Sequence, residues 1–172
     1  MRYERKNCSA HAFPRKVLPR IKFAKTTEEK VKAIKNEKTH LLRIDKGENI
    51  TKSIIDYAKE NSIKSGIVYG IGALCNVEIG YFDSTSKEYR RKHLEGIFEL
   101  LSLTGNITQD GDSPFLHAHV VLGSRDFTLT GGHLFSGDVA VTGEIFIVET
   151  PFHVERKINQ EIGLKLIQIP EK

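Results

Sequence analysis

The segment Ala140-Val-Thr-Gly-Glu-Ile-Phe-Ile-Val148 is highly informative about the fold, because apolar side chains occupy both its odd and its even positions. β-Branched and aromatic residues favour a strand, and successive side chains of a strand point to opposite faces of a sheet. A strand that is apolar on both faces needs cover on both. We therefore expect a sheet that is covered on each side by a helix, by a second layer or by another subunit.

Much of the chain on either side of this segment has the same β-rich character. Strands are predicted at residues 40–44, 64–75, 77–81, 89–94, 98–107, 116–122, 127–130, 139–148 and 164–169. Turn residues separate several of them, at 45–48, 84–87, 109–112 and 136–138. Residues 158–163 are expected to turn helically before the last strand.

One helix is predicted, from Asn49 to Asn61. Asn49 or Thr51 can cap its first turn, and the apolar residues that follow recur at helical spacing, at Ile50, Ile54, Ile55 and Ala58. One early helix followed by many antiparallel strands makes an α+β domain.

Positive charge is concentrated at the start of the chain. Residues 1–35 contain eleven Lys or Arg residues and three Glu residues, whereas the whole chain has a net charge of +4. The remaining residues therefore carry a net charge of −4. Residues 1–25 form an irregular arm containing Pro14 and Pro19, and residues 26–37 form a short polar helix or a linker. A basic arm attracts polyanions such as DNA or an acidic partner surface; the alternative is a solvated extension.

Several classes of protein find no support in the sequence. No apolar run reaches 18 residues, so no membrane span is expected, and the first residues lack the apolar core of a secretory signal. Cys8 and Cys75 are too isolated for a disulfide framework or a thiolate zinc site, and Cys75 is expected to be a small buried apolar residue. We expect a cytoplasmic protein.

Three histidines form the candidate site. His117 and His119 share one face of their predicted strand, with Cα atoms about 6.6–6.8 Å apart, and His133 follows in Gly131-Gly132-His133. A third imidazole from a neighbouring strand would complete a three-histidine metal site. Zn²⁺ is favoured because three neutral nitrogens and a water satisfy its tetrahedral preference, although imidazole also suits Cu, Ni and Fe. The alternative is a buried histidine cluster that hydrogen-bonds backbone groups across a subunit interface. The other histidines, His11, His40, His93 and His153, are interpreted as core or surface residues.

A catalytic metal site would usually also need a general base. Glu99 and Glu144 are the candidates, because each lies in an apolar strand where a carboxylate needs a partner. Their alternative role is a salt bridge at a strand edge or interface. Motifs for covalent catalysis, such as a nucleophile elbow or a P-loop, do not occur.

Several segments together resemble the PPC domain, named for plants and prokaryotes, over about residues 38–170. The matching segments are 70–83, 98–106, 116–119, 131–134, 155–157 and 163–164. The resemblance implies an antiparallel sheet of about seven strands, one major helix and assembly into a trimer. It also implies that His117, His119 and His133 hold a divalent metal, and that the protein is of the prokaryotic group described as DNA-binding. The Arg-Gly-Arg-Pro core of the plant AT-hook does not occur in the chain.

We therefore expect residues 1–37 to be a basic arm with a linker and residues 38–170 to be one PPC-like domain. Three functions compete. The first, which we favour, is a homotrimeric, metal-containing module that binds DNA or a partner protein without catalysis. The second is a small metal-dependent enzyme, of hydrolase or lyase type, acting on a small molecule at the three histidines. The third is a structural trimer that the metal stabilises.

Overall fold

The computed structural model of the chain describes residues 22–23 and 31–169. Seven antiparallel strands form one sheet in the order β1-β2-β3-β7-β4-β5-β6, and β7 also pairs with β6. Their bounds are β1 Lys22–Phe23, β2 Val31–Asn36, β3 Thr39–Asp45, β4 Gly66–Asp83, β5 Glu88–Asp110, β6 Ser113–Gly123 and β7 Leu129–Glu149. The sheet of about seven strands is therefore confirmed.

Three of these strands are longer than predicted. The segments 64–75 and 77–81 merge into β4, the segments 89–94 and 98–107 merge into β5, and the segments 127–130 and 139–148 merge into β7. The turn predicted at 136–138 is wrong, because these residues lie within β7, where its register with β4 shifts. A bulge bends a strand without ending it, and Gly96, with φ +97°, is one such position in β5.

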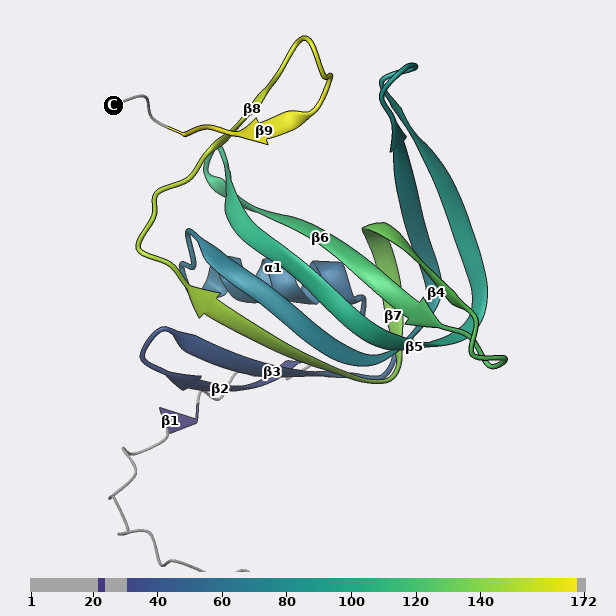
Figure 1. Cartoon of the computed structure of the whole chain (residues 1–172). Helices are drawn as coiled ribbons and strands as arrows, with labels where there is room; N and C mark the ends of the chain where they lie inside the picture. The colour runs from purple at the N-terminus through teal and green to yellow at the C-terminus, as the bar shows by residue number, and fades with distance from the viewer. Residues whose placement is uncertain (1–21, 24–30, 170–172) are drawn as a thin grey trace, which may run out of the picture.

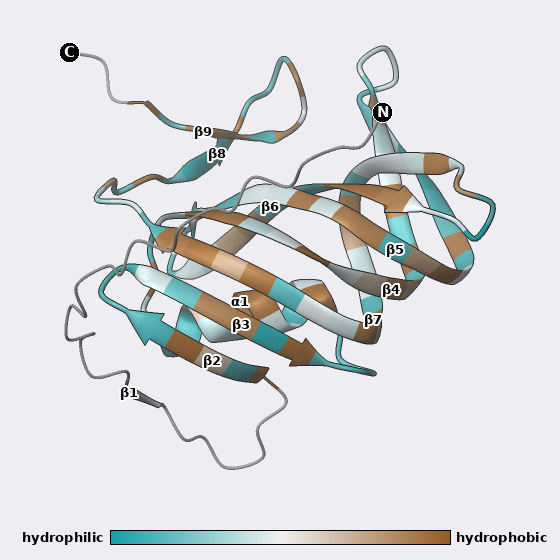
Figure 2. Cartoon of the chain, turned by 60° about the horizontal axis from the view of Figure 1, so that its bottom comes forward, coloured by the Kyte–Doolittle hydropathy of each residue, from teal (hydrophilic) through white to brown (hydrophobic). Residues whose placement is uncertain are grey.

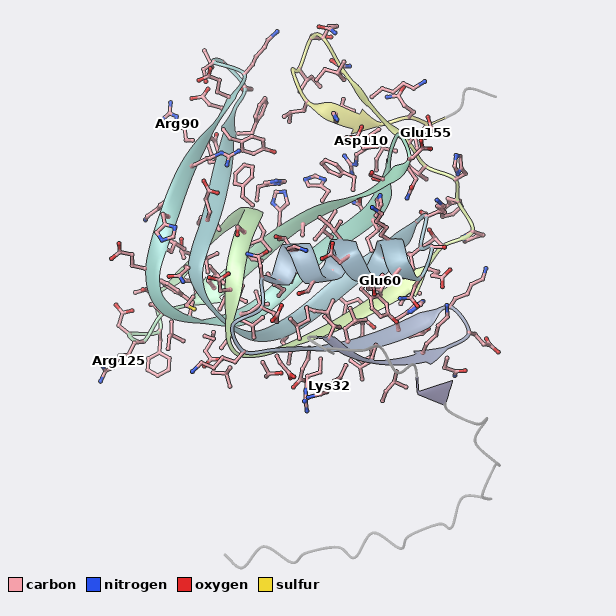
Figure 3. The ribbon with its side chains drawn as sticks, turned by 180° about the vertical axis from the view of Figure 1, so that it is seen from behind. Lys32, Glu60, Arg90, Asp110, Arg125 and Glu155 are labelled. Carbon is pink, nitrogen blue, oxygen red and sulfur yellow. The ribbon has the colours of Figure 1, made fainter. Side chains whose placement is uncertain are left out.

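Because β4 and β5 bend, their outer halves leave the plane of the sheet. The outer halves of β4 and β5 form a hairpin that rises from the rest of the sheet, and its tip is the predicted turn at residues 84–87 (Figure 1). A second hairpin, β8 (Arg156–Ile158) and β9 (Lys165–Ile167), lies on the same side (Figures 1 and 3). Strand β8 ends at Ile158, and the helical turn expected in this segment follows it, because the backbone N–H of Gly163 donates to the carbonyl oxygen of Asn159 four positions earlier. A further bond joins Asn159 to Leu164, just before β9.

The helix α1 spans Ile50–Glu60, in agreement with the prediction. The side chain of Asn49 caps it by accepting a hydrogen bond of 3.1 Å from the backbone N–H of Lys52. Its apolar stripe packs on one face of the sheet, and hydrophobic residues recur along the facing strands in Figure 2. The largest fully buried side chains are Leu42, Ile44, Ile50, Ile54, Ile63, Leu74, Leu100, Leu103, Ile107, Leu122, Ile145 and Ile147.

The opposite face of the sheet carries apolar side chains that one chain leaves exposed. In β4 burial alternates, with Val68 fully buried and its neighbours Ile67 and Tyr69 about half exposed. Leu101 on β5 and Val141 on β7 are also exposed. The helix therefore supplies the expected cover on one side, and the cover on the other side is absent within the described part of a single chain.

The N-terminal predictions need one correction. Residues 31–36, expected to be a polar helix or linker, form strand β2, in which Val31 lies opposite Ile44 and Ala33 opposite Leu42. Pairing with β3 stabilises a segment whose local pattern indicates no strand. Most of the predicted basic arm, with Cys8 and His11, lies outside the described residues. Within the described part, no helix has the length and hydrophobicity of a membrane span.

Candidate metal centre

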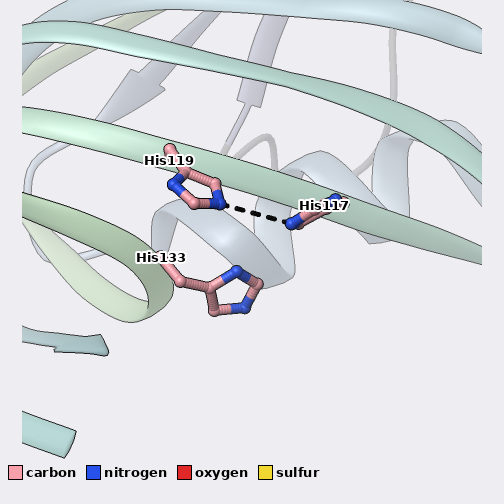
Figure 4. Close-up of side chains that lie close together, drawn as sticks. All are labelled: His117, His119 and His133. Carbon is pink, nitrogen blue, oxygen red and sulfur yellow. Dashed lines mark hydrogen bonds between the residues drawn. The ribbon is translucent and has the colours of Figure 1, made fainter. Parts of the chain in front are cut away.

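Two adjacent strands bring the three histidines together. His117 and His119 lie on β6, on the face opposite the buried side chains of Ala118 and Val120. His133 lies on β7 directly opposite His119 in the β6–β7 ladder. The imidazole rings point toward one another (Figure 4), and one nitrogen of each lies within 4.8 Å of those of the other two.

The spacing of two of these nitrogens suits a shared ion. Nε2 of His117 and Nε2 of His119 are 3.3 Å apart. Two nitrogens bound to one tetrahedral Zn²⁺, each at about 2.0–2.1 Å, are separated by about 3.3 Å. The third ring lies close by, with its centroid 5.2 Å from that of His117 and 5.4 Å from that of His119. Small rotations of the side chains would bring all three nitrogens to one centre.

The protonation of the imidazoles also suits metal binding. Burial, together with the positive charges of His117, His119, Arg91 and Arg156, lowers the pKa of His133 to about 4. Burial and the charge of Arg156 also lower the pKa of His117. These rings are neutral at pH 7, and a neutral imidazole is the form that binds a metal.

One polar atom of the site has no hydrogen-bond partner among the described residues. Nδ1 of His133 is buried and makes no hydrogen bond, although buried polar atoms usually have one. An orphaned ring nitrogen beside two other imidazoles is explained by an absent ligand. Three imidazoles with this orphan therefore fit a divalent transition metal.

Arg156 is a part of the site to which the sequence analysis assigned no role. Its guanidinium lies 3.5 Å from Nδ1 of His117, and it donates hydrogen bonds to Asn106 Oδ1 at 2.9 Å and Thr108 Oγ1 at 2.8 Å. It comes from β8 in the C-terminal hairpin, 39 positions beyond His117. The segment 155–157 contributed to the family resemblance, but nothing in its local pattern indicates a contact with the histidines.

An aromatic wall closes another side of the site. The His133 ring lies with its centroid 5.0 Å from that of Tyr89 and 4.7 Å from that of Phe135. Arg91 stacks on the Phe135 ring at 3.8 Å, and its guanidinium is paired with Glu78 at 3.3 Å. Tyr89 and Arg91 belong to the raised β4–β5 hairpin, so the bend in the sheet brings these two residues to the histidines, whereas Phe135 lies on β7 with His133.

The two candidate general bases lie elsewhere in the chain. Glu144 on β7 pairs with Ile71 on β4, so β4 and β5 separate it from β6, about 14 Å along the sheet. Glu99 pairs with Gly123, four positions past His119 on β6, which is about 13 Å along the strand. Both side chains are exposed. Within one chain, therefore, neither carboxylate stands beside the imidazoles.

The remaining histidines match their interpretation where they are described. His40 is fully buried, with Nδ1 3.0 Å from the Tyr57 hydroxyl and Nε2 2.8 Å from Glu149 Oε1. His93 and His153 are exposed. Cys75 is half-buried, less than expected.

Comparisons with known proteins identify relatives. The family profile described as the Plants and Prokaryotes Conserved (PCC) domain matches residues 31–151. A PPC protein from Pyrococcus horikoshii is 34% identical, with a TM-score of 0.73, and the match covers 86% of this chain and 100% of that one. Among curated proteins, none matches the chain.

Two further solved structures carry descriptions that bear on the site. A protein from Archaeoglobus fulgidus, called a metal-containing protein, is 32% identical over 88% of this chain and 100% of its own, with a TM-score of 0.72. A protein from Bacteroides thetaiotaomicron, called a "putative dna binding protein", is 27% identical over 81% of this chain and 98% of its own, with a TM-score of 0.79.

Proposed function

The chain belongs to the Plants and Prokaryotes Conserved domain family, and on this premise we propose that it is a homotrimeric, metal-containing module that binds DNA or a partner protein. The observation that carries the proposal is the convergence of three imidazoles from β6 and β7 within 4.8 Å of one another. The arrangement supports a divalent ion held by His117, His119 and His133, and the donor set favours Zn²⁺.

The description of the Archaeoglobus relative as metal-containing supports a bound metal in this chain. When bound, a divalent ion supplies a Lewis acid and a fixed positive charge. The chain's own residues hold the imidazoles in place: the β6–β7 ladder sets His119 against His133, and Arg156 adjoins His117. We favour a non-enzymatic role because the two candidate general bases, Glu99 and Glu144, both lie away from the imidazoles in the sheet.

The metal site is tested by elemental analysis of protein purified without added metal and after loading with Zn²⁺. We expect one equivalent of Zn²⁺ per chain in the wild type. The affinity of His119→Ala for Zn²⁺ should be at least tenfold lower. The matched control is His93→Ala, which removes an exposed imidazole of β5 and should bind as the wild type does. Equal metal content in all three proteins would show that the ligands lie elsewhere.

Assembly into a trimer is supported by the exposed apolar face. Ile67, Tyr69 and Ile71 alternate on the open side of β4, each with 45–55% of its surface exposed. Contiguous exposed apolar surface of this kind marks an interaction site. Further copies of the chain would bury this face and supply the second cover that the sheet needs.

DNA binding is supported by the N-terminal charge and by the description of the Bacteroides relative. Of the basic residues before position 36, Lys32 and Lys35 lie on β2 and face Asp45 and Glu149 at 2.9 and 3.6 Å. The rest of the excess charge therefore falls before β2. We propose that the chain divides into this basic arm and one PCC domain, with β2 on the domain's side of the boundary.

The arm is tested in the full chain by replacing its six outermost bases with Gln, at Arg2, Arg5, Lys6, Arg15, Lys16 and Arg20. We expect weaker binding of duplex DNA in fluorescence anisotropy and a shallower dependence of log Kd on log salt concentration. A control replaces the exposed Lys46, Lys59 and Lys64 of the domain and should bind almost as the wild type does. Unchanged binding by the arm variant would remove the arm from the proposal.

A further inference from the structure

We propose that the three-histidine centre takes a small oxyanion, a carboxylate or a phosphate, and that Arg156 is the residue that anchors it. The inference rests on the proposed metal site and names the chemical class of its ligand.

Arg156 carries a buried charge without a counter-charge. Only 8% of its surface is exposed. Its hydrogen bonds go to Asn106, Thr108, the carbonyl oxygen of Lys165 and Nδ1 of His117, all of them neutral acceptors. No carboxylate pairs with it in the described part of the chain. A buried guanidinium is costly unless an anion pairs with it, so the site is short of one negative charge.

Arg91, the other arginine near the histidines, has the carboxylate partner that Arg156 lacks among the described residues. Arg91 contributes to the positive field at His133, but its guanidinium is paired with Glu78 at 3.3 Å. Arg91 is therefore already compensated, whereas Arg156 is not. A divalent ion at the imidazoles would add two further positive charges to a site whose described ligand atoms are all neutral.

Arg156 is also held ready for an anion. Three bonds fix the plane of the guanidinium, from Nε to Thr108 Oγ1 at 2.8 Å, from one terminal nitrogen to the Lys165 carbonyl at 3.0 Å and from the other to Asn106 Oδ1 at 2.9 Å. With the contact to His117, four of its five N–H groups are used, which leaves one for a ligand. A planar guanidinium with fixed orientation matches the geometry of carboxylate and phosphate.

Metal binding would free a second donor. The nitrogens of His117 and His119 that are spaced for a shared ion are the two Nε2 atoms. A neutral imidazole that binds through Nε2 carries its proton on Nδ1. Nδ1 of His117 then becomes a donor facing Arg156, also a donor, and their 3.5 Å contact can no longer be a hydrogen bond. An oxyanion accepts from both.

The position of Arg156 favours a small molecule over a nucleic acid. With 8% of its surface exposed, the guanidinium lies below the reach of a rigid duplex backbone, whereas a free oxyanion can approach it. The proposed ligand is therefore a small oxyanion, and the test includes DNA as the alternative ligand.

The test uses the full chain loaded with Co²⁺, whose visible absorption reports its ligands, and inorganic phosphate or acetate as the probe. Elemental analysis first establishes loading. We expect either anion to change the spectrum saturably in the wild type. Arg156→Gln should keep its Co²⁺ and bind the anion at least tenfold more weakly, and Arg156→Lys should fall between the two. The control Arg43→Gln, which changes an exposed arginine of β3 paired with Asp45 at 3.1 Å, should stay within about threefold of the wild type.

Each outcome decides the proposal. If the absorption spectrum of the Co²⁺-loaded wild type changes with neither anion, the oxyanion proposal is overturned, while the proposed metal site is unaffected. If the spectrum changes only on addition of a short DNA duplex, the ligand is not a small oxyanion. If the wild type binds no Co²⁺, both the metal site and the oxyanion proposal are overturned. If Arg156→Gln fails to fold, the wild-type titration and Arg156→Lys still decide, because equal anion affinity in the wild type and Arg156→Lys would show that the guanidinium does not anchor the anion.

Discussion

Gly105 lies directly opposite Ala118 in the β5–β6 ladder, so close that a side chain at position 105 would collide with the backbone between the two histidines of β6. A Cβ atom there would stand 2.3 Å from the carbonyl oxygen of His117 and 2.8 Å from the Cα atom of Ala118. The close approach of these strands therefore requires a glycine at position 105, and it fixes the segment that presents His117 and His119.

We expect Gly105→Ala to destabilise the protein by about 1–3 kcal/mol and to weaken metal binding, because β6 must shift where it carries the imidazoles. Urea unfolding and a competition titration with a zinc chelator measure the two effects. The matched control is Gly123→Ala in the same ladder, whose new Cβ would approach the side chain of Leu101 at 3.3 Å and that of Glu99 at 3.8 Å but no backbone atom that closely. Equal stability of the two variants would show that a Cβ atom at position 105 does not collide with the backbone of β6.

His40 joins β3 to α1 and to the end of β7 through its contacts with Tyr57 and Glu149. We expect His40→Phe to reduce the free energy of unfolding by about 1–3 kcal/mol, because both partners lose a hydrogen bond inside the fold. Urea denaturation measures it, with His93→Phe as the control at an exposed position. A loss no larger than the control's would show that the two bonds contribute nothing net.

The stability of the metal-free protein should depend on pH below neutrality. The pKa of His133 is lowered from 6.5 to about 4, mainly by burial, so the unfolded state takes up the proton first as the pH falls. The free energy of unfolding is therefore highest above pH 6.5 and declines as the pH falls from 6.5 to about 4.

Urea midpoints measured between pH 7.5 and 4 in the presence of a chelator test this dependence. We expect His133→Asn to lose less stability over that range than the wild type, while His93→Asn, at an exposed site, retains the full decline. An identical decline in the His133 variant would show that this ring is not held neutral.

The exposed face of β4 should govern assembly. We expect Ile71→Lys to convert a trimer into monomers in light scattering coupled to size-exclusion chromatography, because Ile71, with 55% of its surface exposed, lies among the apolar residues of that face. Phe152→Lys, which changes an apolar residue outside the strands with 64% of its surface exposed, serves as control. A wild type that elutes as a monomer would remove the trimer from the proposal.

Local patterns predicted the parts of the fold that depend on near neighbours. The cap of Asn49 and the stripe of Ile50, Ile54 and Ala58 specified α1, since helical spacing and capping act within a few residues. Strand alternation likewise placed His117 and His119 on one face of β6, which the structure agrees with. Strand ends were harder, since bulges and glycines let β4, β5 and β7 bend and continue where the pattern breaks.

Local sequence patterns could not predict which distant segments come into contact. The order of strands places Glu99 and Glu144 away from the imidazoles, and that order depends on which hydrophobic faces pack together. Arg156 reaches His117 from a hairpin 39 positions further on, and Tyr89 reaches His133 from β5, whereas Phe135 lies two positions from His133 on β7 itself. Periodicity encodes the direction of a side chain relative to its own strand, whereas the charge and burial around the histidines arise from the packing of segments that are remote in the chain.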